Sequence, residues 1–184
     1  GSREAALVSQ KLGDQLEEIK PITSNDMSDS GNFDAVAELL IHAGDREIHE
    51  AVMMMVPEAW QNKAMAPDRR AFYEYHSCLM EPWDGPAMMS FTDGRYVGAC
   101  LDRNGLRPSR YYVTHDGRVM LSSEVGVLDD LDDAMVSIKQ RLEPGKMFLI
   151  DFDQGRIIPD DELKTKMAAA RPYAEWTATQ PIRM

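Results

Sequence analysis

The chain of 184 residues contains 20 lysines and arginines against 31 aspartates and glutamates, which gives a formal net charge of −11. This acidic balance disfavours nucleic acid and anionic membranes as main partners, because both require basic patches on a protein. Hydrophobic residues make up 43% of the chain, which is enough to form a core and excludes wholesale disorder. The length suits one domain, or one large piece of a bigger domain.

Cysteine is scarce. Cys78 and Cys100 are too few for a disulfide framework or a thiolate metal site of the usual kind, which indicates a reducing, intracellular compartment. No apolar run approaches the roughly 18 residues that a membrane-spanning helix needs. Residues 1–2 are typical of a cloning scar, so we expect the chain to have been cut from a longer protein.

The first part of the sequence predicts helices. Apolar residues recur there at helical spacing among charged residues, and proline or glycine stands near the expected ends. A polar turn over residues 24–32 separates the first two helices, and Gly44 is expected to end the second. The predicted ranges are 3–18, 33–41, 46–56 and 67–78.

After Pro82 the pattern changes to short apolar runs, which predict strands. Turns at 92–95, 115–118 and 153–155 contain glycine and separate three pairs of runs, as in β-hairpins. A late helix is expected over 160–170, and residues 172–184 are weakly patterned. Helices followed by an antiparallel meander and a short helix predict an α+β fold. The predicted strands are 87–91, 96–101, 111–114, 119–121, 147–151 and 157–158.

Ser28, Asp29 and Ser30 stand just before a predicted helix, and two interpretations are open for them. Their side chains are of the types that cap a helix by accepting hydrogen bonds from free backbone N–H groups. Alternatively, a carboxylate fixed at a helix N-terminus binds the ammonium group of an amino-acid ligand.

Other candidate residues favour structural roles. Cys78 and Cys100 lie in apolar patterns that are typical of buried, inert thiols. The segment 101–108 reads as a charged turn whose side chains fix backbone groups, and it is a poor phosphate loop because it has one glycine and no following helix. No metal-ligand spacing is found among the four histidines, His42, His49, His76 and His115.

Five segments, in this order, resemble those of one family. They are SDSGNFD (28–34) with the helix after it, EPWDGPA (81–87), LDRNGLRPSRY (101–111), SSEVGV (122–127) and LEPGKM (142–147). Together they are similar to the glutamine amidotransferase domain of the large chain of glutamate synthase, which is a class II amidotransferase. The resemblance covers residues 3–176 and leaves residues 177–184 as a tail.

The resemblance implies a fold and a reaction. The fold is the four-layer αββα sandwich of the N-terminal nucleophile hydrolases, of which this chain is a part. An N-terminal cysteine attacks the side-chain amide of glutamine with its own α-amino group as base, a γ-glutamyl thioester forms, ammonia leaves and water releases glutamate. The ammonia then reaches a distant flavin site, where 2-oxoglutarate is converted to glutamate.

The family pattern is incomplete in this sequence. The first residue is Gly1, neither cysteine is in the setting of the nucleophile, and the segment that supplies the oxyanion hole is missing. The chain is therefore expected to be a C-terminal portion of the domain with no catalytic residue and no metal site. Asp29 matches the aspartate that binds the α-amino group of glutamine, and Ser28 and Ser30 flank it as further candidates.

The resemblance also implies partners. The chain itself is expected to need no cofactor, whereas the parent protein uses FMN and an iron–sulfur cluster with NAD(P)H or ferredoxin as electron donor. Expected partners are L-glutamine, the remainder of the large chain and a small electron-donor subunit, with no nucleic acid and no membrane. The expected location is cytoplasmic, or organellar in a plant or alga. Two alternatives stay open: a non-catalytic binding or scaffold module that keeps the fold, and an unrelated α+β interaction domain.

Overall fold

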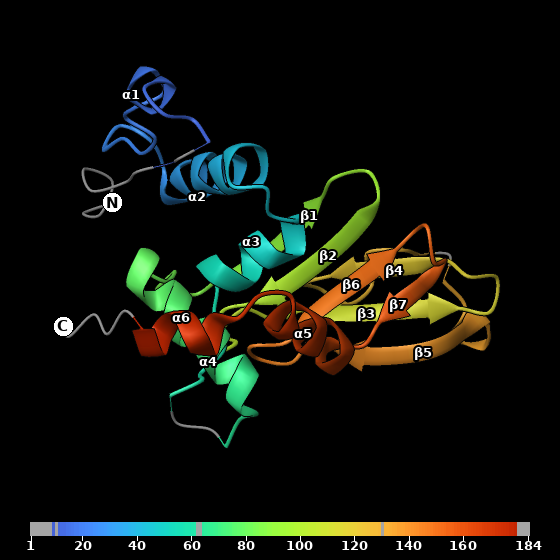
Figure 1. Ribbon diagram of the computed structural model, residues 1–184. Coiled ribbons are helices and arrows are strands. Elements are labelled where there is room, and N and C mark those ends of the chain that lie inside the picture. The colour runs from blue at the N-terminus through green and yellow to red at the C-terminus, as the bar shows by residue number, and fades with distance from the viewer. Residues whose placement is uncertain (1–8, 10, 62–63, 130, 180–184) are drawn as a thin grey trace. The chain divides into compact units, whose positions relative to one another are not determined.

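The structure is a computed structural model that describes residues 9, 11–61, 64–129 and 131–179 (Figure 1). The chain forms two compact units. Unit 1 comprises Gly1–Pro82 and Lys164–Met184, and unit 2 comprises Trp83–Leu163. No helix in the described ranges is both long and apolar enough to cross a membrane.

Unit 1 is helical, as the sequence predicts (Figure 1). Helix α5 (Asp160–Ala169) begins in unit 2 and ends in unit 1, because the boundary between the units falls after Leu163. The other helices are α1 (Gln15–Glu18), α2 (Asp29–Glu38), the π-helix η2 (Leu39–Ala43), α3 (Ile48–Met55), α4 (Pro67–Leu79) and α6 (Tyr173–Thr179).

The predicted helix over 3–18 is wrong in its described part. Residues 11–14 form turns, and only Gln15–Glu18 are helical. The physical reason is Gly13, whose φ of 52° lies in the left-handed region and interrupts a right-handed helix. Residues 3–8 and 10 lie outside the described residues. The helices predicted over 33–41, 46–56 and 67–78 are confirmed, with Gly44 directly after η2 and Pro67 in the first turn of α4.

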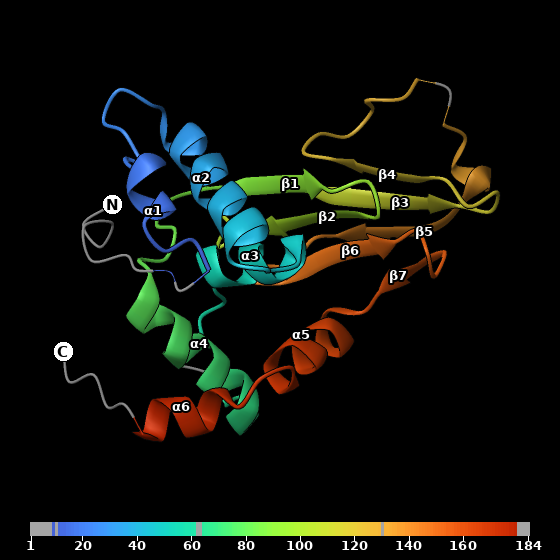
Figure 2. The same cartoon turned by 45° about the horizontal axis from the view of Figure 1, so that its top comes forward.

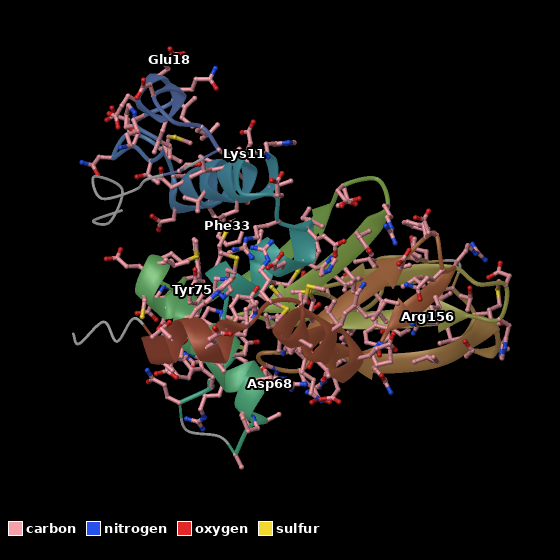
Figure 3. The ribbon with its side chains drawn as sticks, viewed as in Figure 1. Lys11, Glu18, Phe33, Asp68, Tyr75 and Arg156 are labelled. Carbon is pink, nitrogen blue, oxygen red and sulfur yellow. The ribbon has the colours of Figure 1, made fainter. Side chains whose placement is uncertain are left out.

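Helix α6 corrects the expectation of a weakly patterned segment after Pro172. It packs along α4 in both views (Figure 2), and the contact is aromatic. Tyr75 of α4, labelled in Figure 3, lies 5.5 Å from Tyr173 and 5.2 Å from Trp176 between ring centroids. Two aromatic residues are too few to give a seven-residue segment a helical period, so only the packing on α4 reveals the helix.

Helix α3 is buried along its whole length, including its charged residue Glu50. Arg46 forms an ion pair with the Glu50 carboxylate, and the hydroxyl of Tyr173 donates to Oε1 of Glu50 over 3.2 Å. A buried carboxylate is tolerated when it is paired and hydrogen-bonded. These contacts also connect α6 to α3.

Unit 2 is an antiparallel β structure of two sheets. One has the order β1-β2-β6-β7 and the other the order β4-β3-β5. The three predicted hairpins are confirmed as antiparallel neighbours, but the single meander is wrong, because the chain leaves the first sheet after β2 and returns to it at β6. The strands are β1 (Met88–Thr92), β2 (Tyr96–Leu101), β3 (Arg110–Thr114), β4 (Val119–Ser122), β5 (Val136–Arg141), β6 (Met147–Asp151) and β7 (Arg156–Ile158).

The two sheets pack face to face on a shared core. Tyr111 of β3 meets Phe148 of β6 with ring centroids 4.5 Å apart, and Ala99 is the partner of Phe148 in the register of β2 with β6. Ala99, Leu101 and Phe148 of the first sheet are buried in this core, and Tyr111 packs against them.

The helical unit 1 and the antiparallel sheets of unit 2 together confirm the α+β class.

The sequence missed β5. Five of its six residues are exposed, and they include Lys139 and Arg141. An exposed edge strand with cationic residues has neither the apolar run nor the clean alternation that marks a strand in sequence. Strand β5 is therefore recognised only from its antiparallel pairing with β3 in the folded sheet.

Asp102 fixes the corner between β2 and β3. Its side chain is 3% exposed, and its carboxylate accepts backbone hydrogen bonds from Ala87 at 3.0 Å, Asn104 at 3.0 Å and Gly105 at 3.1 Å. Gly105 is required there, because its φ is 62° and an added Cβ would lie 2.4 Å from Cγ of Pro144. The expectation that Asp102 has a structural role is confirmed.

Replacing Asp102 by alanine removes a side-chain acceptor from three backbone N–H groups, among them the buried N–H of Ala87, whereas the N–H of Gly105 keeps the backbone carbonyl oxygen of residue 102 at 2.9 Å. We expect Asp102→Ala to lower the free energy of unfolding by about 2–4 kcal/mol, measured by urea denaturation. Asp84→Ala is the matched control: its carboxylate is 81% exposed and is paired with Arg103, so its loss should cost less than about 1 kcal/mol. Equal effects of the two variants would contradict the structural role of Asp102.

Protonation of His76 should make the fold sensitive to acid. Its Nδ1 lies 2.8 Å from the carbonyl oxygen of Phe72, and its buried Nε2 has no hydrogen-bond partner among the described residues. Burial lowers the pKa of His76 from 6.5 to about 4, the Phe72 hydrogen bond opposes this, and the positive charges of Arg46 and Arg171 lower it further. Between pH 6.5 and about pH 4, His76 binds a proton in the unfolded chain but not in the folded chain. The free energy of unfolding therefore falls as the pH falls, by roughly 3 kcal/mol in total.

We expect His76→Gln to remove most of this slope in the free energy of unfolding between pH 7 and pH 4.5. His115→Gln is the control, because His115 lies exposed in the β3–β4 turn. If both variants keep the slope of the unaltered chain, another group is responsible for the acid sensitivity.

Candidate functional site

The candidate site is the N-terminus of α2 with the pre-α2 loop (residues 24–28). Ser28 has extended backbone angles and caps the helix: its Oγ accepts a hydrogen bond from the backbone N–H of Gly31 over 3.1 Å. The hydroxyls of Ser28 and Ser30 lie 3.1 Å apart and share a hydrogen bond. The capping interpretation is therefore confirmed for Ser28.

Asp29 has a different position. It is the first residue of α2, its side chain is exposed, and no described residue forms a hydrogen bond or ion pair with its carboxylate. Because Ser28 caps the helix, the Asp29 carboxylate does not act as the N-cap. Its carboxylate is therefore available to a cation from outside, such as the ammonium group of an amino acid.

The three predicted site residues are consecutive in the chain, and the structure gives two of them different positions. Ser28 caps α2, and Asp29 is the first residue of the helix. Sequence alone does not make this distinction, because serine and aspartate are about equally good N-caps. Only the backbone decides which of them precedes the first helical residue. Figure 3 labels Phe33, which follows this segment on α2.

Sequence reasoning missed Asn32 and Ser24. The N–H of Ser24 donates to Oδ1 of Asn32 over 2.8 Å, and Nδ2 of Asn32 donates to the carbonyl oxygen of Ser24 over 2.9 Å. The two residues are eight positions apart and lie in a run that reads only as a polar turn. No local pattern reports such a pair.

The two cysteines lie in different units. Cys100 is buried in β2, as expected. Cys78 is only half-buried on α4, so the expectation of a buried thiol is wrong for it; Sγ lies 3.4 Å from the carbonyl oxygen of Glu74, within one turn of the helix. Position 78 falls on the flank of α4, whereas the buried face of that helix carries Phe72 and His76.

The histidines are dispersed. His42 and His115 are exposed, His76 belongs to the aromatic contact of α4 with α6, and Nε2 of buried His49 lies 2.8 Å from the Glu47 carboxylate. Within the described ranges, no three histidine, cysteine, aspartate or glutamate side chains are grouped so as to hold a metal ion.

Comparison with known proteins assigns the chain to a family. The family model of class-II glutamine amidotransferases matches residues 1–176. Over its whole length the chain is 50% identical to the glutamate synthase [NADPH] large chain of Bacillus subtilis, and it covers 12% of that protein. It is 46% identical, again over its whole length, to the glutamate synthase [NADH] of Schizosaccharomyces pombe and covers 9% of that protein. Over 96% of its length it is 45% identical to ferredoxin-dependent glutamate synthase 2, chloroplastic, of Arabidopsis thaliana, and it covers 11% of that protein. The chain therefore spans about a tenth of the length of these relatives.

Proposed function

The chain belongs to the class-II glutamine amidotransferases, and we propose that it is the glutamine-binding portion of the amidotransferase domain of a glutamate synthase. In this role the complete domain releases ammonia from L-glutamine, and the parent protein transfers the ammonia reductively to 2-oxoglutarate. The family match and the glutamate synthase names of the relatives support the assignment. They overturn the alternative of an unrelated interaction domain.

One observation carries the proposed site: a carboxylate that stands exposed at the start of α2 and takes no part in capping the helix. We propose that Asp29 binds the α-ammonium group of glutamine, with Ser28 and Ser30 shaping the loop beside it. An ammonium–carboxylate hydrogen bond is charge-assisted and stronger than a neutral one. It selects an amino acid over an amide that lacks the ammonium group.

The family fold supports a finer description of the domain. We propose that the two packed sheets of unit 2 are the inner layers of the four-layer αββα sandwich of N-terminal nucleophile hydrolases. Residues 3–176 are then part of one amidotransferase domain, which the family match to residues 1–176 supports. The family match ends at residue 176, so residues 177–184 follow it as a tail.

We place the nucleophile outside this chain. The amidotransferase mechanism needs a cysteine whose own α-amino group is the base, and Cys78 and Cys100 each lie within a helix or strand in mid-chain, where the backbone nitrogen is an amide. On this proposal the chain contributes substrate binding and no catalytic residue.

The electron-transfer groups also belong elsewhere in the parent protein. An iron–sulfur cluster is held by cysteine thiolates, usually four, whereas this chain has two cysteines that lie in different units. We therefore assign FMN, the iron–sulfur cluster and any small electron-donor subunit to the parent outside these residues, with NADPH, NADH or ferredoxin as donor, as the names of the relatives suggest. The proposed location is cytoplasmic, or plastid in a plant or alga.

A second candidate is a binding or scaffold module that keeps the amidotransferase fold without activity. The glutamate synthase names of the relatives favour substrate binding, and the exposed Asp29 carboxylate is open to an ammonium group. Kinetics of the parent protein separate the two candidates.

In the parent glutamate synthase, we expect Asp29→Asn to lower kcat/KM for glutamine about 10- to 200-fold, the scale of one hydrogen bond between charged groups, roughly 1.5–3 kcal/mol. Glutamate synthesis from free ammonium should change little, because it bypasses the glutamine pocket. Both activities and the melting temperature are measured for each variant.

Asp34→Asn is the matched control, since Asp34 is exposed on the same helix, five residues further on. It should leave both activities unchanged. Unchanged glutamine kinetics in Asp29→Asn, or a loss that simply follows a lower melting temperature, would refute the site.

The purified 184-residue chain should release no ammonia from glutamine above the uncatalysed rate. The reason is that neither cysteine combines a thiol with a free α-amino group. Steady ammonia release that survives Cys78→Ala and Cys100→Ala would show that another nucleophile exists in the chain.

A further inference from the structure

We propose that Asn32 is a positioning residue for glutamine binding: its side chain closes the pre-α2 loop and so fixes the backbone from which the Asp29 carboxylate projects. The inference rests on the proposed role of Asp29 and goes beyond it, because neither the family resemblance nor the match to relatives gives Asn32 a task. Asn32 itself stays clear of the substrate.

The geometry of Asn32 is that of a two-bond clamp. Its amide accepts from the Ser24 N–H over 2.8 Å and donates to the Ser24 carbonyl over 2.9 Å, so both polar groups of one side chain pair with both backbone groups of one residue. This is the pattern by which two strands pair residue to residue, formed here by a side chain. An amide satisfies it, whereas a carboxylate lacks the donor and a hydroxyl lacks the span.

Ser24, the first residue of the loop, accepts two further hydrogen bonds from it. Its carbonyl oxygen also accepts from the N–H of Met27 over 3.3 Å, and its Oγ accepts from the N–H of Asp26 over 3.1 Å. The turn of the loop is therefore formed around the residue that Asn32 holds.

The other end of the loop is held by the first backbone hydrogen bond of α2, which any residue with a backbone N–H at position 32 would form. The backbone N–H of Asn32 donates to the carbonyl oxygen of Ser28 over 2.9 Å. Residues 24 and 28 are thus both bonded to Asn32, one through its side chain and one through its backbone. The loop becomes a closed ring that ends at the residue directly before Asp29.

This ring matters because the backbone of Asp29 lies where the loop joins the first turn of α2. The side chain is exposed and has no hydrogen-bond or ionic partner among the described residues, so its place depends on its backbone. The Ser28 cap and the Asn32 clamp set that backbone before substrate arrives. Preorganisation of this kind raises affinity by reducing the ordering that binding would otherwise require.

The test uses the parent glutamate synthase with Asn32→Ala and, as matched control, Asn25→Ala, which removes an exposed asparagine of the same loop. We expect Asn32→Ala to raise KM for glutamine about tenfold with kcat within about twofold, since the lost positioning affects ground and transition state alike. Synthesis from ammonium should be unchanged. Amide hydrogen exchange over residues 24–28 should become faster in Asn32→Ala and stay the same in Asn25→Ala.

A double variant shows whether Asn32 acts through Asp29. If it does, Asn32→Ala adds little to the effect of Asp29→Asn on kcat/KM, whereas independent roles give effects that multiply. Multiplying effects, an unchanged KM in Asn32→Ala, or a parallel loss of the ammonium-dependent activity would each overturn the inference. If Asp29→Asn alone changes nothing, the proposed function fails as well; if Asp29→Asn raises KM and Asn32→Ala does not, only this inference fails.

Discussion

The complete burial of α3 is the constraint on which unit 1 depends. Eight successive residues, Ile48–Met55, are out of solvent, and among them is the carboxylate of Glu50. A buried charge is costly unless it is paired, so the surroundings must supply Arg46 and the hydroxyl of Tyr173. The need to satisfy Glu50 therefore brings a segment more than 120 residues away to α3, and the same Tyr173 ring packs on α4. The hydrogen bond to Glu50 and the ring contact with Phe72 thus connect α6 to α3 and α4.

The candidate site shows a division of tasks among neighbouring residues. Ser28 accepts from the Gly31 N–H at the start of α2, Asn32 closes the loop before it, and the Asp29 carboxylate has no partner among the described residues. If the aspartate had been the cap, its oxygens would be occupied by the backbone and unavailable to an ammonium group. In the proposed site the Asp29 carboxylate thus stays exposed, while Ser28 and Asn32 fix the backbone around it.

The secondary structure of unit 2 was largely accessible from sequence, whereas its sheet order was not. Glycines with positive φ in the 92–95, 115–118 and 153–155 turns are local features, and they correctly indicated three hairpins. Strand β5 has no such signal because its residues face solvent. The partition of strands between two sheets was also hidden, since it depends on how the faces of β2 and β6 meet β3 in a common core.

By itself the sequence determined the class of fold and, through its ordered motifs, the family, and it led to the proposal that Asp29 binds the glutamine ammonium group. It also indicated correctly that Asp102 is structural. Only the tertiary structure decided that Ser28 is the cap, that Asn32 bonds to Ser24, and that residues 173–179 are a helix. The physical reason is range: turns, periods and motifs are set by neighbours along the chain. Which of several neighbouring polar residues is the cap, and which groups pair across a loop or in the interior, is set by atoms that meet only after folding.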